Sequence, residues 1–236
     1  MKKHIDNPLF SRRDLLLSGT ATALSISVVS APNTAQAAQS VGERRKSVRF
    51  DLDRFVDDCR VANRETARQA AIQQVLDRAL ADPAEVMAVI GEPETAGIQT
   101  LYRSDDLTIL NIVWAPLMQL MPHEHKMWSA VGLYTGREDN IFWTRTSRSI
   151  SADGALSLAA GETAGLPDDV IHSVVNPIQK LTGAIHIYGG DFFAVPRSEW
   201  DPATLKEDAW DIEKARRLFG ESNERFTAWK AAKNCS

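Results

Sequence analysis

The sequence predicts a mainly β fold, a closed barrel or sandwich with helices before and after it. Residues 50–92 and 202–232 repeat their apolar side chains at helical spacing. Residues 97–196 instead break into short runs rich in Ile, Val, Leu, Trp and Tyr, which turn residues separate. The 236 residues are 44% hydrophobic and 25% charged with a net charge of −4, which is typical of a globular protein. This composition excludes disordered, collagen-like, disulfide-rich and multi-pass membrane classes, and its mild acidity argues against nucleic-acid binding.

The N-terminus has the pattern of an export signal. Arg12 and Arg13 precede a moderately apolar run that ends near Pro32, and Ala35–Ala37 has the small-x-small pattern of a cleavage site. The run is a poor membrane span, because spanning needs about 20 strongly apolar residues; an uncleaved anchor remains the alternative. Residues 1–37 resemble signals of the bacterial twin-arginine (Tat) pathway, whose substrates fold before they cross the membrane. We therefore expect export by the Tat translocase, a periplasmic location and no membrane attachment after cleavage.

Residues 38–49 are polar and basic and predict a flexible lead-in to a single domain over 50–236. Two or three helices are expected over 50–92. Asp82 and Pro83 are suited to the N-cap and the first position of one of them, and Gly91 with Pro93 ends the helical region.

The barrel is expected over residues 97–196, followed by closing helices over 202–232. The candidate strands are Ile98–Tyr102, Leu107–Trp114, Trp128–Tyr134, Ile141–Thr146, Ala155–Leu158, Ile171–Val175, Gly183–Tyr188 and Phe192–Val195. Turn residues at 104–106, 135–140, 152–154, 176–177 and 189–191 separate these runs.

Histidines are few after the signal, and two of them lie in a His-x-His pattern. His123 and His125 flank Glu124 just before a predicted strand. In an extended chain, residues i and i+2 point to the same side, so both imidazoles face one way and Glu124 faces the other. The pair predicts part of a metal site, although an isolated pair of this kind is about as often structural.

A second motif follows about fifty residues later, where Gly161, Gly165 and Pro167 lead to His172 and Asn176. The two motifs together resemble those of the cupin superfamily, the double-stranded β-helix barrels. The glutamate ligand usual in the first motif would fall at Ser129 or Ala130 and is absent. The resemblance implies a neutral metal site of His123, His125 and His172. Fe(II) is the expected metal, with Zn, Mn or Ni as alternatives, because three imidazoles alone do not select iron.

Further segments resemble the cysteine dioxygenase family of thiol dioxygenases, and beside it the bacterial metal-dependent double-stranded β-helix enzymes. These segments are Tyr102-Arg103, Val113-Trp114, His172–Asn176 and His186-Ile187-Tyr188. The resemblance implies that Arg103 grips a substrate carboxylate, that the Tyr188 hydroxyl lies near oxygen or substrate, and that His186 orients Tyr188. The alternatives are a surface ion pair of Arg103 with Asp105 or Asp106, and a plain core position for Tyr188.

The expected function is that of a dioxygenase that oxidises a small thiol carboxylate to its sulfinate with O2. Two alternatives remain: a non-catalytic periplasmic cupin that binds a metal or small ligand, and an enzyme with the same site and a non-thiol substrate. Cys59 and Cys235 match no metal or redox motif, although they could pair in an oxidising compartment.

Overall fold

The computed structural model describes residues 49–234. The predicted signal over 1–37, nearly all of the lead-in and Cys235 lie outside the described residues. Within the described part of the chain, no helix is both long enough and apolar enough to span a membrane.

Three helices precede the β region, as the sequence predicts. They are α1 (Leu52–Ala62), α2 (Arg68–Ala79) and α3 (Pro83–Ile90). The Asp82 carboxylate accepts a hydrogen bond from the Ala84 N–H at 3.2 Å, and Pro83 opens α3. Gly91 ends α3 at a φ of 102°, which glycine adopts without steric cost.

The β region forms two antiparallel sheets. One has the strand order β1-β2-β9-β4-β7 and the other the order β11-β10-β3-β8-β5-β6. The strands are β1 (Gly97–Arg103), β2 (Thr108–Trp114), β3 (Gln119–Glu124), β4 (Ser129–Thr135), β5 (Arg137–Arg145), β6 (Ile150–Ala159), β7 (Thr163–Leu166), β8 (Ile171–Val175), β9 (Thr182–Tyr188), β10 (Ser198–Trp200) and β11 (Glu207–Ala209). Strands β2 to β9 follow the order of a jelly roll, the double-stranded β-helix that cupins share: they alternate between the sheets except at β5 and β6, which pair as a hairpin within the second sheet. The predicted fold class is confirmed.

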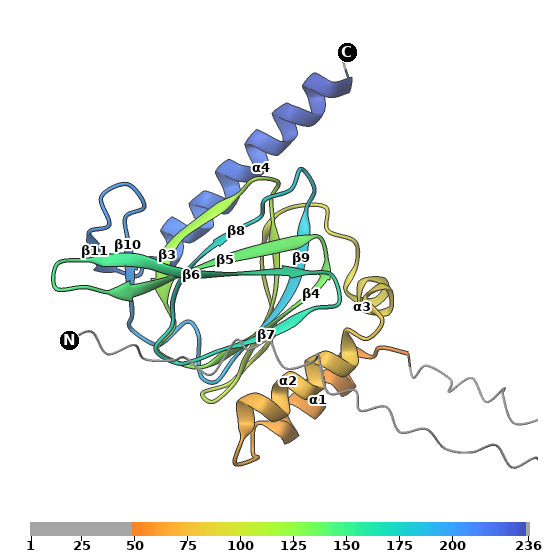
Figure 1. Cartoon of the computed structure of the whole chain (residues 1–236). Helices are drawn as coiled ribbons and strands as arrows, with labels where there is room; N and C mark the ends of the chain where they lie inside the picture. Colours follow the sequence, from red (N-terminus) through yellow and green to blue (C-terminus); the bar gives the residue numbers. More distant parts are fainter. Residues whose placement is uncertain (1–48, 235–236) are drawn as a thin grey trace, which may run out of the picture. The chain divides into compact units, whose positions relative to one another are not determined.

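Helices cover the outer face of the first sheet, and this explains why its central strands β2 and β9 are buried along their whole length. Figure 1 shows α2 and α3 beside the strands β4 and β7, α1 alongside α2, and α4 (Ile212–Asn234) on the opposite side of the barrel. In β9, Ile185 and Ile187 pack against the N-terminal helices, whereas the alternate residue Tyr188 packs with the barrel interior. All seven residues of β9 are therefore buried.

The structure corrects several predicted boundaries. The predicted turn at 135–140 is instead a tight reversal at Gly136, whose φ is 79°, and β5 begins at the next residue. The predicted break at 152–154 lies within β6. Strands β3, β7 and β10 were absent from the predicted set. The final region holds one helix, α4, and the short strand β11, in place of helices over 202–232.

The strand predicted at Phe192–Val195 is a turn. The Asp191 carboxylate accepts a hydrogen bond from the Phe193 N–H at 3.0 Å, and the Asp191 carbonyl accepts one from the Ala194 N–H at 3.1 Å. Such local bonds offer the backbone an alternative to a sheet, so apolar composition alone misleads here.

Candidate metal centre

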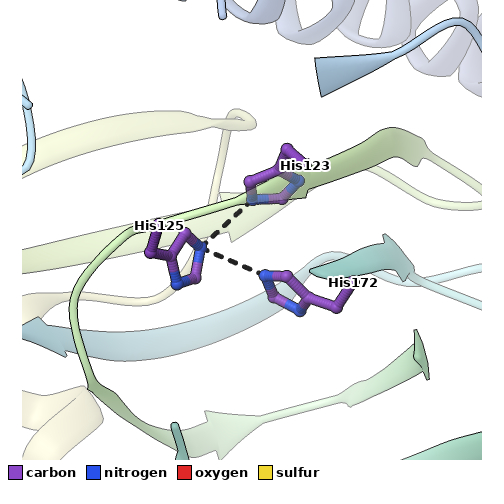
Figure 2. Close-up of side chains that lie close together, drawn as sticks. All are labelled: His123, His125 and His172. Atoms are coloured by element: carbon purple, nitrogen blue, oxygen red, sulfur yellow. Dashed lines mark hydrogen bonds between the residues drawn. The ribbon is translucent and has the colours of Figure 1, made fainter. Parts of the chain in front are cut away.

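Three buried histidines meet inside the barrel. His123 lies on β3 directly opposite His172 on β8, and His125 follows the end of β3. The Nε2 atom of His125 lies 3.2 Å from Nε2 of His123 and 3.1 Å from Nε2 of His172. Figure 2 shows the three rings turned toward one another. Within the described chain, this is the group of His, Cys, Asp or Glu side chains arranged to hold a metal ion.

The outer nitrogens of two of these rings are already occupied. Nδ1 of His123 lies 3.0 Å from the Met121 carbonyl oxygen, and Nδ1 of His172 lies 2.7 Å from Oδ1 of Asn140. Both partners accept hydrogen bonds, so Nδ1 carries the proton in each ring and Nε2 carries the lone pair. The Nε2 lone pairs of His123 and His172 consequently both face Nε2 of His125, and a cation between the three rings would satisfy them.

Two of the three nitrogen–nitrogen distances match one bound ion. Two nitrogens each about 2.1 Å from an ion, at angles of about 90–109°, are about 3.0–3.4 Å apart, and the observed distances are 3.1 and 3.2 Å. Burial lowers the pKa of His123 to about 4. Burial, reinforced by neighbouring histidines, holds the pKa of His125 and of His172 well below 6.5. All three rings are therefore neutral at pH 7, as metal ligation requires.

A buried polar network supports His172. Asn140 Nδ2 donates to Oε1 of Glu138 at 3.0 Å, which fixes the amide so that its oxygen faces His172. Oε2 of Glu138 accepts a hydrogen bond from Trp114 Nε1 at 2.7 Å and lies 3.3 Å from Nε2 of His186. Burial alone would raise the pKa of Glu138, but the facing His186 and the hydrogen-bond donors hold it below its usual value. Glu138 is thus a buried carboxylate that orders the polar groups behind the site.

Tyr188 and His186 line the same cavity as the three histidines. The Tyr188 ring lies edge-on to His125, with 5.0 Å between centroids, and its hydroxyl lies 3.4 Å from Nδ1 of His186. Burial raises the pKa of Tyr188 above its usual value, so the phenol keeps its proton. The cavity volume is about 20 Å³, close to the space that one water molecule needs.

The structure does not bring Arg103 to this cavity. Its side chain is 49% exposed, and Nε and Nη2 donate to the two carboxylate oxygens of Asp191 at 2.9 and 2.8 Å. The surface-ion-pair alternative therefore describes its position, with Asp191 as partner in place of Asp105 or Asp106. Glu124 also points away from the three histidines, to Arg145 and Lys126, as the alternation along the chain predicts.

Sequence reasoning missed three residues near the site: Glu138, Asn140 and Arg197. The first two lie in the segment that was predicted as a turn, where the Glu-x-Asn spacing on a strand would have placed both side chains on one face. Arg197 is 6% exposed, and no local motif marks it.

The fold and the site thus define a class of protein, namely a jelly-roll barrel with an inward-facing three-histidine centre. No protein-family model and no curated protein matches the chain. Solved structures with a similar fold include an RmlC-like cupin of Methanocaldococcus jannaschii, 12% identical, covering 43% of this chain and 86% of that one with a TM-score of 0.37. A Cupin 2 conserved barrel protein of Salinispora arenicola is 20% identical, covering 39% and 74%, with a TM-score of 0.33.

An oxalate oxidase in complex with the substrate analogue glycolate is 13% identical to the chain, with a TM-score of 0.33. The likeness covers 42% of this chain and 53% of that chain. These neighbours are cupins or share the barrel, and the likeness extends to the fold alone.

Proposed function

We propose that this protein is a metal-dependent dioxygenase that oxidises a small thiol at the three-histidine centre, with Fe(II) as its metal. The observation that carries the proposal is the convergence of three buried, neutral imidazoles at Nε2 distances of 3.1 and 3.2 Å. The absence of a carboxylate ligand leaves such a centre with the full charge of its ion and with open coordination positions. Those are the properties that an anionic sulfur ligand and O2 together require.

The reaction is RSH + O2 → RSO2H, in which sulfur is oxidised, O2 is reduced, the O–O bond breaks and two S–O bonds form. No further reductant is needed. A bound metal would supply binding sites for sulfur and O2 and would lower the thiol pKa. His123, His125 and His172 would hold it. The protonated Tyr188 hydroxyl would donate a hydrogen bond to the ligands, and the apolar cavity wall would exclude water.

Metal content and oxygen consumption test this proposal together. The wild-type protein should contain one iron per chain, consume O2 with a thiol, and yield a product heavier by two oxygen atoms in mass spectrometry. His125→Ala should lose both metal and activity, because it removes the ligand nearest both other nitrogens. His186→Gln is the matched control and should retain metal, because His186 lies outside the ligand cluster.

Two results would contradict the proposal in different ways. Stoichiometric metal without O2 uptake on any thiol would indicate a binding protein or an enzyme with another substrate. Unchanged metal content in His125→Ala would show that the three histidines do not form the metal site.

A further inference from the structure

The cavity at the three histidines is closed too tightly for an organic substrate. Its volume is about 20 Å³, which is close to the space that one water molecule needs. A thiol with a carbon chain needs more space than that, and O2 must enter beside it. Some part of the cavity wall therefore has to move before such a reaction can start.

The C-terminal segment supplies one part of this wall, and the barrel strands with the turns after β3 and β9 supply the rest. Trp210 lies just before α4, and Ala215 and Phe219 lie on it. The Phe219 ring stacks on the Trp114 ring with 5.3 Å between centroids, and the Trp210 ring lies 5.0 Å from the His123 ring. The first half of α4 thus covers the metal centre.

Two polar contacts hold this part of α4 in place. On β10 of the second sheet, the buried Glu199 carboxylate accepts a hydrogen bond from the Asp211 N–H at 3.2 Å and forms a salt bridge with Lys214. Just before β1 of the first sheet, the Ala96 N–H donates to Oδ1 of Asn223 at 2.8 Å, and Nδ2 of Asn223 donates to the Ala96 carbonyl oxygen at 2.9 Å. The residues of α4 that line the cavity lie between these two anchors.

The two anchors differ in strength. The contact at Glu199 is charged and buried, and the Trp210 N–H adds a hydrogen bond to the Arg197 carbonyl oxygen at 2.9 Å. The contact at Asn223 consists of two neutral hydrogen bonds, which contribute less than charged ones. Within the described chain, no side chain of α4 after Asn223 belongs to an apolar core cluster, and Figure 1 shows this end of α4 extending past the barrel. The anchor at Asn223 is therefore the one that releases first.

We infer that α4 is a lid that releases at Asn223, turns about its anchor at Glu199 and so admits molecules to the metal centre. The inference rests on the proposed function only for the identity of the molecule that enters, a small thiol. Because α4 follows the last strand of the barrel, its movement breaks no strand pairing. The lid can therefore open while the barrel stays folded, as a local opening with a smaller free-energy cost than global unfolding.

Labelling of two buried thiols with N-ethylmaleimide tests the lid without any metal. Ser222, three residues after Phe219, is 3% exposed, so the thiol introduced by Ser222→Cys reacts only when α4 lifts. Cys59 is 0% exposed in the core under the N-terminal helices and reports unfolding of the same molecule, in a Cys235→Ser background. Mass spectrometry of the peptides should show the introduced thiol reacting at least tenfold faster than Cys59.

Loss of the weaker anchor should make opening more frequent. Asn223→Ala removes both hydrogen bonds to Ala96, so it should accelerate labelling of the Ser222→Cys thiol at least fivefold and leave Cys59 unchanged. Arg216→Gln is the matched control, because Arg216 pairs with Glu213 within α4 itself, and it should change neither rate. Equal labelling rates of the two thiols, or a rate that Asn223→Ala leaves unchanged, would overturn the lid.

Melting temperature establishes whether each variant folds. If Asn223→Ala fails to fold, Asn223→Asp carries the test: it keeps an oxygen for the Ala96 N–H but loses the donor, so labelling should accelerate at least twofold. In the metal-loaded protein, Asn223→Ala should also speed removal of the ion by EDTA at least fivefold. Faster labelling with unchanged metal removal would show that α4 moves without opening the site, and would overturn the lid. A protein that binds no metal would instead overturn the proposed function, and the labelling rates would still decide the lid.

Discussion

Asn140 decides which nitrogen of His172 is free for a metal. Its amide oxygen accepts the Nδ1 proton of His172 at 2.7 Å, and its amide nitrogen is committed to Glu138 at 3.0 Å. Because the carboxylate of Glu138 only accepts hydrogen bonds, the amide has one orientation and His172 one tautomer. A residue that touches no metal thereby sets the donor that the metal would meet.

Asn140→Leu should therefore lower metal affinity by about 10–100-fold, the usual effect of losing a hydrogen-bond partner behind a histidine ligand. Competition with a chelator measures this affinity. Asn111→Leu is the matched control: Asn111 is also buried and accepts a hydrogen bond from Tyr134 at 2.9 Å, but lies outside the cavity lining. It should lower stability and leave metal affinity unchanged. Equal losses of affinity in both variants would contradict the role of Asn140.

The buried thiol of Cys59 gives the protein a sensitivity to alkali. Burial raises its pKa from 9.0 to about 12. A group whose pKa is raised by folding stabilises the fold below its unfolded pKa, and this contribution is lost as pH rises from 9 toward 12. At pH 10.5 the free energy of unfolding is therefore lower by about 2 kcal/mol.

Urea unfolding at pH 8 and pH 10.5, in a Cys235→Ser background, measures this loss. Cys59→Ala should be less stable at pH 8 but should lose about 2 kcal/mol less than the parent between the two pH values. An identical decrease in both proteins would show that the thiol does not titrate as its burial requires.

Among the secondary structure elements, β4 and α2 approach unusually closely at Gly132. A Cβ added there would lie 2.3 Å from Cδ1 of Leu80 and 2.9 Å from Cδ2 of Leu76, below any ordinary contact. The missing side chain is what lets the helix lie on the sheet. Gly154 on β6 is a strand glycine without this constraint, since the nearest atom, in Phe142, is 3.8 Å away.

Gly132→Ala should lower the free energy of unfolding by about 1–3 kcal/mol, because the added methyl group overpacks the interface between helix and sheet. Gly154→Ala, measured by the same denaturant titration, should stay within about 0.5 kcal/mol of wild type. Metal affinity should be unchanged in both. A neutral Gly132→Ala would mean that α2 can move away from β4 at little cost.

The reach of local sequence patterns explains which parts of the fold and of the candidate site could be predicted from the sequence. Alternation along an extended chain predicts that His123 and His125 face one way, and the resemblance to the two cupin motifs implied His172 as the third candidate ligand. Arg103 was assigned to the substrate from the family resemblance, and no local pattern marks the Asp191 carboxylate that it binds, because Asp191 lies 88 residues away in sequence. Arg197 was missed for a related reason: its aromatic neighbours Phe192 and Trp210 surround it only after the chain has folded.

For the whole molecule, the proposed location depends on the N-terminal signal. We expect replacement of both Arg12 and Arg13 by Lys to stop export, because the Tat pathway recognises the arginine pair, and to leave folded protein in the cytoplasm. Cell fractionation with detection of the processed chain measures this. The same replacement at Arg44 and Arg45, an arginine pair that follows the predicted cleavage site, is the matched control. Continued export of the Arg12/Arg13 variant would contradict the proposal that the Tat pathway carries the protein to the periplasm.

The cross-strand pairing of His123 with His172 has a consequence for how the protein would acquire its metal. An extended chain holds these donors 49 residues apart, and only a closed jelly roll makes them neighbours. A chain that crosses the membrane already folded would close its barrel in the cytoplasm. The metal supply of that compartment, and not that of the periplasm where the protein would work, would then decide which ion it carries.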